Sequence, residues 1–298
     1  MATRKRSKKT GDKSKRSRPR ADGASVAPSV APPPRGSGTR WLVIAAAAAL
    51  VVGVLVWEGS PPGTVAPESL RLLVIERHPH DTGAFTQGLL WHEGKLYEST
   101  GQYGESTVRR VDLATGEVEE QTPLPDDLFA EGLARMGDEL VQITWRGRKA
   151  LVWDLGDLSS VREHSYHGEG WGLCFDGERF VMSTGSDRLV FRDPRTFERI
   201  GEVRVKRAGR PLRRLNELEC VDGLVYANIW MDDNIARIDP ETGDVTGWID
   251  ASGLLPEDER TGGEDVLNGI AYIPETGHFL LTGKNWPFLF EVDFVPTQ

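Results

Sequence analysis

The chain has 298 residues, of which 27% are charged and 39% are hydrophobic, so most of it is able to form a globular body. Residues 1–40 contain 12 Lys and Arg but only 2 Asp and Glu. The remainder contains 24 Lys and Arg and 43 Asp and Glu. A body with a net charge of −19 lacks the basic face that binds phosphates, which argues against nucleic acid as a partner.

The N-terminal part divides into a tail and an apolar run. Residues 1–40, with a net charge of +10 and many Lys, Ser, Pro and Gly, predict a disordered tail. Residues 41–57 carry no charge and have Trp at both ends, which favours an uncleaved membrane helix over a buried core helix. A cleaved signal peptide is the alternative, but no small-residue cleavage pair follows directly. We therefore expect a cytoplasmic tail, a transmembrane anchor at 41–57, a linker at 58–67 and an extracytoplasmic body at 68–298, which would be secreted if the anchor were cleaved.

The body contains five repeats of about 46 residues, within the range of β-propeller blades. Each unit has the pattern strand, Gly-containing hairpin, strand, loop, strand, Asp-led turn and strand. The pattern predicts an all-β, five-bladed β-propeller, and a β-sandwich is the weaker alternative because it does not require five-fold repetition. The last unit lacks its fourth strand, which the stretch at residues 70–79 can supply.

Cys174 and Cys220 occupy equivalent places in two successive repeats, "CFDG" and "CVDG". A disulfide is permitted in an exported domain, but two buried thiols fit the same pattern. The sequence leaves both possibilities open.

One position in each repeat changes while its surroundings stay alike. In "FTQGLL", "FAEGLA", "GWGLCF", "NELECV" and "LNGIAY" the residue before the Gly-Leu step, or its equivalent, differs. The first strand of a blade lines the central channel and the second returns antiparallel, so these residues should meet those at the ends of the second strands. Together the two sets place a glutamate, amides, a lysine and aromatic residues at one mouth of the channel: Phe85, Gln87, Phe129, Glu131, Trp145, Trp171, Asn216, Trp230, Asn268 and Lys284.

Polar channel linings often bind only water, but three tryptophans and several amides around one glutamate are more typical of a binding site. None of the six histidines falls in these positions, and "HPHD" at 78–81 fits either a turn or a ligand cluster. A glycosidase would need a second carboxylate, for which Glu217 is available. The set predicts no metal site and no cofactor, but a single carboxylate that is able to move a proton.

Several motifs resemble one known family. "HPHDTGAFTQGLL", "FAEGLA", "ITW", "GEGWGL", "LNELE", "ANIW", "LNGIAY" and "TGKNWP" are similar to the plant and bacterial glutaminyl-peptide cyclotransferases, and the resemblance covers residues 70–295. It implies a five-bladed propeller that converts the N-terminal glutamine of peptides to pyroglutamate, with Glu131 as the catalytic acid and base. It also implies a substrate site at Phe85, Gln87, Phe129, Trp145, Trp171, Asn216, Trp230 and Lys284. The alternative from another class is a non-catalytic envelope propeller that binds peptides or scaffolds a complex.

Overall fold

The computed structural model describes residues 66–297, which belong to one compact unit. The predicted tail (1–40), the predicted anchor (41–57) and most of the predicted linker therefore lie outside the described residues. Within the described range, no helix has the length and apolar character that crossing a membrane requires.

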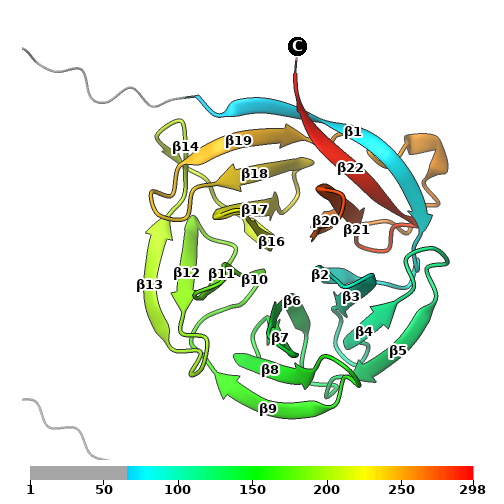
Figure 1. The fold of residues 1–298 in the computed structure, drawn as a ribbon, viewed down its shortest axis with the longest axis vertical. Coiled ribbons are helices and arrows are strands. Elements are labelled where there is room, and N and C mark those ends of the chain that lie inside the picture. The colour runs from blue at the N-terminus through cyan, green and yellow to red at the C-terminus, as the bar shows by residue number, and fades with distance from the viewer. Residues whose placement is uncertain (1–65, 298) are drawn as a thin grey trace, which may run out of the picture. The chain divides into compact units, whose positions relative to one another are not determined.

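Three four-stranded antiparallel sheets follow one another along the chain, each in sequential strand order (Figure 1). The first contains β2 (Thr86–His92), β3 (Lys95–Thr100), β4 (Thr107–Val111) and β5 (Val118–Pro123). The second contains β6 (Ala130–Met136), β7 (Glu139–Thr144), β8 (Lys149–Asp154) and β9 (Ser160–Ser165). The third contains β10 (Leu173–Phe175), β11 (Phe180–Ser183), β12 (Arg188–Arg192) and β13 (Arg199–Arg204), and the small hairpin β14 (Lys206–Arg207) and β15 (Arg210–Pro211) follows it.

The remaining strands form one eight-stranded sheet in the order β16-β17-β18-β19-β1-β22-β21-β20. Its bounds are β16 (Leu215–Val221), β17 (Leu224–Ile229), β18 (Asn234–Ile238), β19 (Val245–Asp250), β1 (Glu68–Pro79), β22 (Phe288–Pro296), β21 (His278–Gly283) and β20 (Leu267–Ile273), with the 3-10 helix η1 (Glu257–Glu259) between β19 and β20. The predicted pairing of the N-terminal strand with the last repeat is confirmed, because β1 lies antiparallel to β22. The sequence did not predict that β1 also pairs in parallel with β19, which joins two four-stranded runs edge to edge.

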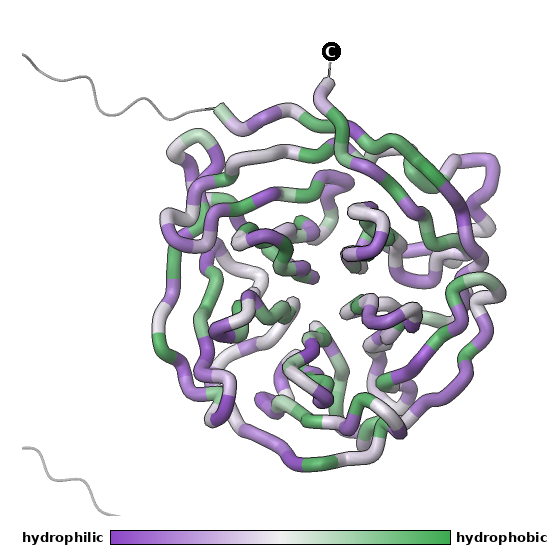
Figure 2. Tube along the Cα trace, viewed as in Figure 1, coloured by the Kyte–Doolittle hydropathy of each residue, from purple (hydrophilic) through white to green (hydrophobic). Residues whose placement is uncertain are grey.

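The sheets surround a common centre, and β2, β6, β10, β16 and β20 lie nearest to it, as expected for a propeller-like fold (Figure 1). These inner strands are almost wholly buried, whereas β5 alternates between half-buried and exposed residues. Hydrophilic positions accordingly recur along the outer strands in Figure 2. The core therefore lies between neighbouring sheets and around the centre.

The glycine of the repeated motif is required by the close approach of these inner strands. A Cβ atom on Gly132 would lie 2.3 Å from the backbone nitrogen of Leu173, and one on Gly172 would lie 2.0 Å from the carbonyl oxygen of Asn216. The backbone N–H of Gly132 donates to the carbonyl oxygen of Trp171 across the same gap, at 2.9 Å. Glycine thus lets the backbones of successive sheets touch at the centre.

The Asp-led turns also form as the sequence predicts. Asp112 Oδ1 accepts a hydrogen bond from the backbone N–H of Thr115 at 2.8 Å, and Gly116 adopts a φ of 72°. An Asp side chain at the first position of the turn and a glycine at the left-handed position are the expected chemistry for this hairpin.

Cys174 and Cys220 form a disulfide with a Cα–Cα distance of 5.5 Å, which resolves the choice that the sequence leaves open. It connects β10 to β16, the inner strands of two neighbouring sheets. The covalent link therefore stabilises the packing at the centre of the fold.

Candidate active site

Four of the five variable residues lie at β-bulges at the start of the inner strands, and the fifth, Trp171, lies just before β10. The register shifts between Thr86 and Gly88 in the first sheet and between Ala130 and Leu133 in the second. The same irregularity occurs in β16 around Asn216 and in β20 around Asn268. A bulge interrupts the alternation of a strand and redirects a side chain, which explains how buried strands can present polar groups to one mouth of the channel.

The ends of two second strands, β7 and β21, lie beside the starts of the inner strands. The backbone N–H of Trp145, just after β7, donates to the carbonyl oxygen of Phe129 at 2.9 Å. The backbone N–H of Lys284, just after β21, donates to the carbonyl oxygen of Val266 at 3.0 Å. Each pair places a residue of the second strand beside the bulge of the first.

These residues line one cavity of about 400 Å³. Nine of the ten residues that we selected from the sequence contribute to it, together with three that we did not select: Phe85, Gln87, Phe129, Glu131, Trp145, Trp171, Asn216, Trp230 and Lys284, and in addition Arg146, Glu169 and Asp265.

Asn268 differs from expectation, because it is fully buried and is not among the residues that line the cavity. Its side-chain amide donates to the carbonyl oxygen of Thr86 at 2.9 Å and to Gln87 Oε1 at 3.2 Å. Its Oδ1 accepts from Asn216 Nδ2 at 2.8 Å. Asn268 therefore orients the side-chain amides of Gln87 and Asn216, both of which line the cavity. Because it bonds the oxygen of Gln87, the amide nitrogen of Gln87 has no hydrogen bond to the described residues.

Glu131 provides a buried carboxylate at the cavity surface. Its side chain belongs to a residue that is only 5% exposed, and its carboxylate oxygens accept no hydrogen bond from the described residues. Burial raises the pKa of Glu131 well above its ordinary value, the positive charge of Lys284 opposes this, and the negative charge of Glu169 adds to it. A carboxyl group in this setting keeps its proton to a higher pH than an exposed glutamate does.

Lys284 is also buried, at 5% exposure, and its ammonium nitrogen lies 4.7 Å from the centroid of the Phe85 ring. Burial lowers the pKa of Lys284, although the carboxylates of Glu131 and Asp265 act in the opposite direction. The side-chain ammonium of Lys284 forms no ion pair or hydrogen bond with the described residues, so its N–H groups are free to contact a ligand.

Aromatic rings form the walls of the cavity. Phe129 makes edge-on contacts with Phe85 and Trp145, at centroid distances of 6.1 and 5.8 Å. Trp171 and Trp230 make a similar contact at 5.6 Å, and Trp230 is 40% exposed, so it lies at the rim. Apolar walls with a few polar groups are the usual composition of a small-molecule site.

Glu169 and Arg146 complete the rim and were missed by the sequence reasoning. Glu169 Oε2 accepts hydrogen bonds from the indole N–H groups of Trp145 at 2.9 Å and of Trp171 at 3.2 Å, and its Oε1 accepts one from Arg146 Nε at 3.0 Å. Burial alone would raise the pKa of Glu169, but these hydrogen bonds hold it below its ordinary value. Glu169 lies two residues before the variable position in "GEGWGL", so the comparison of repeats could not select it.

The "HPHD" motif does not reach the cavity. His80, Glu98 and Arg109 form a buried network next to β2, in which Glu98 accepts from His80 Nε2 at 3.1 Å and from Arg109 Nη2 at 2.6 Å. Arg109 Nη1 also donates to the half-exposed Asp81 at 2.8 Å. Glu98 also accepts from Thr86 Oγ1 at 2.6 Å, directly beside Gln87. Burial opposes ionisation of Glu98, but Arg109 and His80 hold its pKa far below the ordinary value. The network therefore anchors the strand that carries part of the site.

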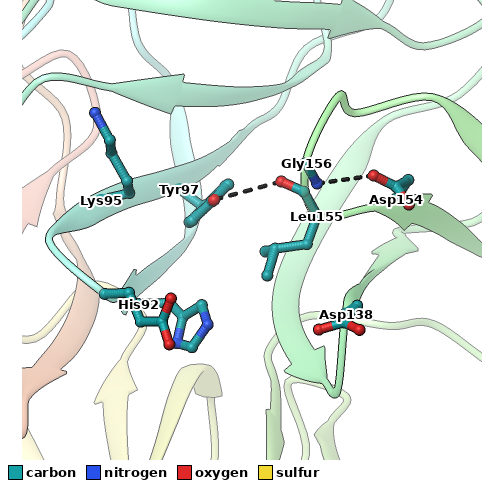
Figure 3. A pocket seen from close by; sticks show the side chains of 8 residues that line it. His92, Lys95, Tyr97, Asp138, Asp154, Leu155 and Gly156 are labelled. Carbon is teal, nitrogen blue, oxygen red and sulfur yellow. Dashed lines mark hydrogen bonds between the residues drawn. The ribbon is translucent and has the colours of Figure 1, made fainter.

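Other cavities are more polar or more open to solvent. The one in Figure 3, of about 380 Å³, lies between the first two sheets at the other end of β2, and its lining includes His92, Tyr97 and Asp138. Tyr97 Oη donates to the carbonyl oxygen of Leu155 at 3.4 Å and so bridges the two sheets. A further cavity of about 410 Å³ occupies the opposite mouth of the central channel, near Glu219 and the disulfide. Neither combines an unpaired buried carboxylate with aromatic walls.

Comparisons with known proteins show the family of the chain. A sequence model described as glutamine cyclotransferase matches residues 45–294. A glutaminyl-peptide cyclotransferase from Arabidopsis thaliana is 43% identical over 225 residues, which is 74% of this chain and 70% of the relative. The crystal structure of a glutaminyl cyclase from Myxococcus xanthus is 41% identical with a TM-score of 0.74, and the match covers 78% of this chain and all of that structure. The chain belongs to the glutamine cyclotransferase family.

Proposed function

We propose that this chain is a glutaminyl-peptide cyclotransferase, which converts the N-terminal glutamine of peptides and proteins to pyroglutamate and releases ammonia. Its family and the names of its relatives support this activity. The observation that carries the mechanism is the buried carboxylate of Glu131, which has no hydrogen bond from the described residues and faces a cavity with aromatic walls.

The reaction is an intramolecular acyl transfer. The neutral α-amine of the substrate attacks its own γ-carboxamide carbon, a five-membered ring closes, and the bond from that carbon to the amide nitrogen breaks. The α-amine has an ordinary pKa of about 7.7–8.0, so part of it is already neutral near pH 7. Because nucleophile and carbonyl belong to one residue, a pocket that holds the side chain folded lowers the entropic part of the barrier.

Glu131 moves the proton that this chemistry requires. The ionised carboxylate accepts a proton from the attacking amine, and the resulting acid donates it to the departing nitrogen, which leaves as ammonia. General acid and base catalysis works best when the pKa of the group is near the working pH, and burial moves Glu131 in that direction.

The amide oxygen becomes negatively charged in the tetrahedral intermediate and needs hydrogen-bond donors. Gln87 and Lys284 are buried residues that line the cavity, and the Gln87 amide nitrogen and the Lys284 ammonium form no hydrogen bond with the described residues, so they are suited to this role. Asn268 orients Gln87 by occupying its oxygen, which turns the amide so that its nitrogen is the free group.

The proposed chemistry uses no metal and no cofactor. The residues that line the cavity include neither His nor Cys, and the carboxylate of Glu169 already binds two indoles and one guanidinium group. The substrate is a peptide or protein with N-terminal glutamine, and Phe129 and the tryptophans would enclose its side chain.

The direct test is incubation of the full-length protein with a peptide that begins with glutamine, in the presence of a metal chelator and well below the unfolding temperature. We expect mass spectrometry to show the loss of one ammonia per peptide. The same peptide with an acetylated α-amine should not react, because it has no nucleophile. Binding of the peptide without conversion would instead support the non-catalytic peptide-binding propeller, and activity that the chelator abolishes and zinc restores would contradict the metal-free mechanism.

We also propose that the fold comprises five blades. In support, the eight-stranded sheet divides at the parallel β19–β1 contact into two antiparallel runs of four strands, and three separate four-stranded sheets complete the ring. An experimental structure with continuous antiparallel pairing across that contact would contradict this count.

We further propose that residues 41–57 anchor the protein in a membrane, with the enzyme on the outer side and the basic tail in the cytoplasm. The apolar run with its basic flank supports this proposal. Protease added outside spheroplasts should digest or release the folded domain while the tail stays protected. Recovery of the folded domain in the cytosolic fraction would contradict the anchor.

A further inference from the structure

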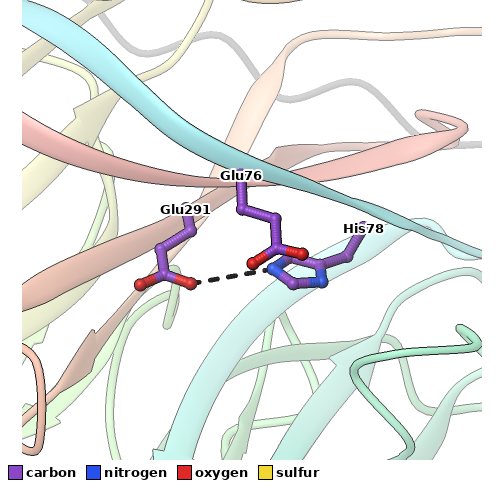
Figure 4. A group of neighbouring side chains, drawn as sticks. All are labelled: Glu76, His78 and Glu291. Atoms are coloured by element: carbon purple, nitrogen blue, oxygen red, sulfur yellow. Dashed lines mark ion pairs between the residues drawn. The ribbon is translucent and has the colours of Figure 1, made fainter.

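Three side chains converge on the outer rim of the fold, away from the cavity. Glu76 and His78 lie two residues apart on β1 and therefore on the same face of the strand. Glu291 on β22 is the direct cross-strand partner of Glu76. Figure 4 shows the three side chains turned toward one another, and one potential ligand atom from each lies within 4.8 Å of the other two.

The two carboxylates of this cluster are not paired with a Lys or an Arg of the described residues. Glu76 and Glu291 are directly opposite each other, an arrangement that destabilises a strand pair when both carboxylates are ionised. Among the described residues, neither forms an ion pair with a Lys or an Arg, and the Glu291 side chain is only 12% exposed. A bound cation would remove the repulsion.

The imidazole of His78 supplies a nitrogen ligand. Its Nε2 atom is buried without a hydrogen-bond partner, although it lies 3.7 Å from Glu291 Oε2. Two ligand atoms of a tetrahedral zinc ion lie roughly 3.4 Å apart when the bonds are about 2.1 Å long. A small rotation of either side chain would thus place both atoms on one ion and satisfy the orphaned nitrogen.

A second histidine, His278, contacts the carboxylate of Glu291. His278 Nδ1 lies 2.5 Å from Glu291 Oε1, the oxygen that does not face His78, and His278 Nε2 lies 3.9 Å from Asp293 Oδ1. Metal-binding carboxylates are commonly held by hydrogen bonds of this kind. His278 therefore fixes the orientation of Glu291 and leaves its other oxygen free for a ligand.

We propose that Glu76, His78 and Glu291 bind one divalent transition-metal ion of the zinc class. One imidazole nitrogen with carboxylate oxygens suits Zn²⁺ better than Mg²⁺ or Ca²⁺, which prefer oxygen ligands alone. The ion connects the first strand of the fold to the last, so it holds the ring closed. It contributes to stability and takes no part in the reaction, because none of its ligands lines the cavity.

The test is metal binding and thermal unfolding of the full-length, tag-free protein after removal of metal with a chelator and dialysis. We expect one Zn²⁺ per chain by calorimetric titration, with no comparable binding of Mg²⁺. At a free Zn²⁺ concentration of about one hundred times Kd, the unfolding temperature should rise by about 5–10 °C. The rate of N-terminal glutamine cyclisation, measured well below that temperature, should not depend on Zn²⁺.

The His78→Gln and Glu76→Gln variants should bind Zn²⁺ at least about tenfold more weakly and lose most of the thermal shift. Glu76 is exposed, so its variant keeps the test valid if His78→Gln folds poorly. His167→Gln, which changes an exposed histidine outside the cluster, is the matched control and should behave as the wild type. The proposal is wrong if the wild type binds no Zn²⁺, or if both cluster variants bind it as tightly as the control does.

Discussion

The Glu131→Gln variant should cyclise N-terminal glutamine with a kcat at least about a hundredfold below that of the wild type. Removal of a general acid and base typically costs about 10²–10⁴ in rate, or roughly 3–5 kcal/mol of transition-state stabilisation. KM should change far less, because binding depends mainly on the aromatic walls. The fold should be retained and should become relatively more stable as pH rises, because the raised pKa of Glu131 makes ionisation of the wild-type carboxyl group destabilising. Steady-state kinetics and urea unfolding at two pH values would measure both effects.

Glu217→Gln is the matched control for this experiment. Glu217 is a buried carboxyl group with a pKa raised by burial, as in Glu131, but it does not line the cavity. Its oxygens accept backbone hydrogen bonds from Ile270 at 2.9 Å and from Leu89 at 3.4 Å, so the substitution should affect stability more than kcat. A well-folded Glu131→Gln enzyme with a kcat within a few-fold of wild type would show that Glu131 only lines the channel.

The Arg109→Met variant should lower the free energy of unfolding by about 3–5 kcal/mol, since it leaves a buried charge without its partner. Arg109 is 5% exposed and donates to Glu98 from both Nε and Nη2, at 2.8 and 2.6 Å. The Glu98 carboxylate, which is fully buried, would keep only His80 and Thr86 as partners. Because the folded pKa of Glu98 is depressed, the stabilisation is present at neutral pH, above the unfolded pKa, and is lost only in strong acid.

Arg110→Met, at the next position of β4, is the control for Arg109→Met. Arg110 pairs with Glu119 and Glu120 near the surface, and surface ion pairs contribute at most about 1 kcal/mol. Urea unfolding at pH 7 would compare the two variants. Equal losses of unfolding free energy in both variants would mean that the buried network stabilises the fold no more than a surface ion pair does.

The repeat pattern was sufficient to predict the all-β class, the pairing of β1 with β22, and nine of the twelve residues that line the cavity. This succeeded because strand alternation and Gly-containing turns are local signals, and because each repeat carries an equivalent position. The parallel contact between β1 and β19 has no such signal, since it depends on how two edges meet in space.

The details of the site were harder to predict because they also depend on how separate strands meet in space. Asn268 occupies an equivalent position to Glu131, yet its bulge directs the amide toward Gln87 and Asn216 beneath the cavity. Glu169 lies outside the repeated position and enters the site only through its hydrogen bonds to two tryptophans. Side-chain direction at a bulge and contacts between neighbouring sheets are tertiary properties, which a single sequence does not encode in a readable pattern.

The central claim, that the ionised carboxylate of Glu131 carries the proton, is tested most directly by the ratio of the wild-type kcat to the Glu131→Gln kcat across pH. Ionisations that are common to both enzymes cancel in this ratio. If the account is correct, the ratio is large at alkaline pH and falls as pH decreases through the raised pKa of Glu131, with a midpoint well above the ordinary value for a glutamate. A ratio that stays constant across this range, or that remains near one, would contradict it.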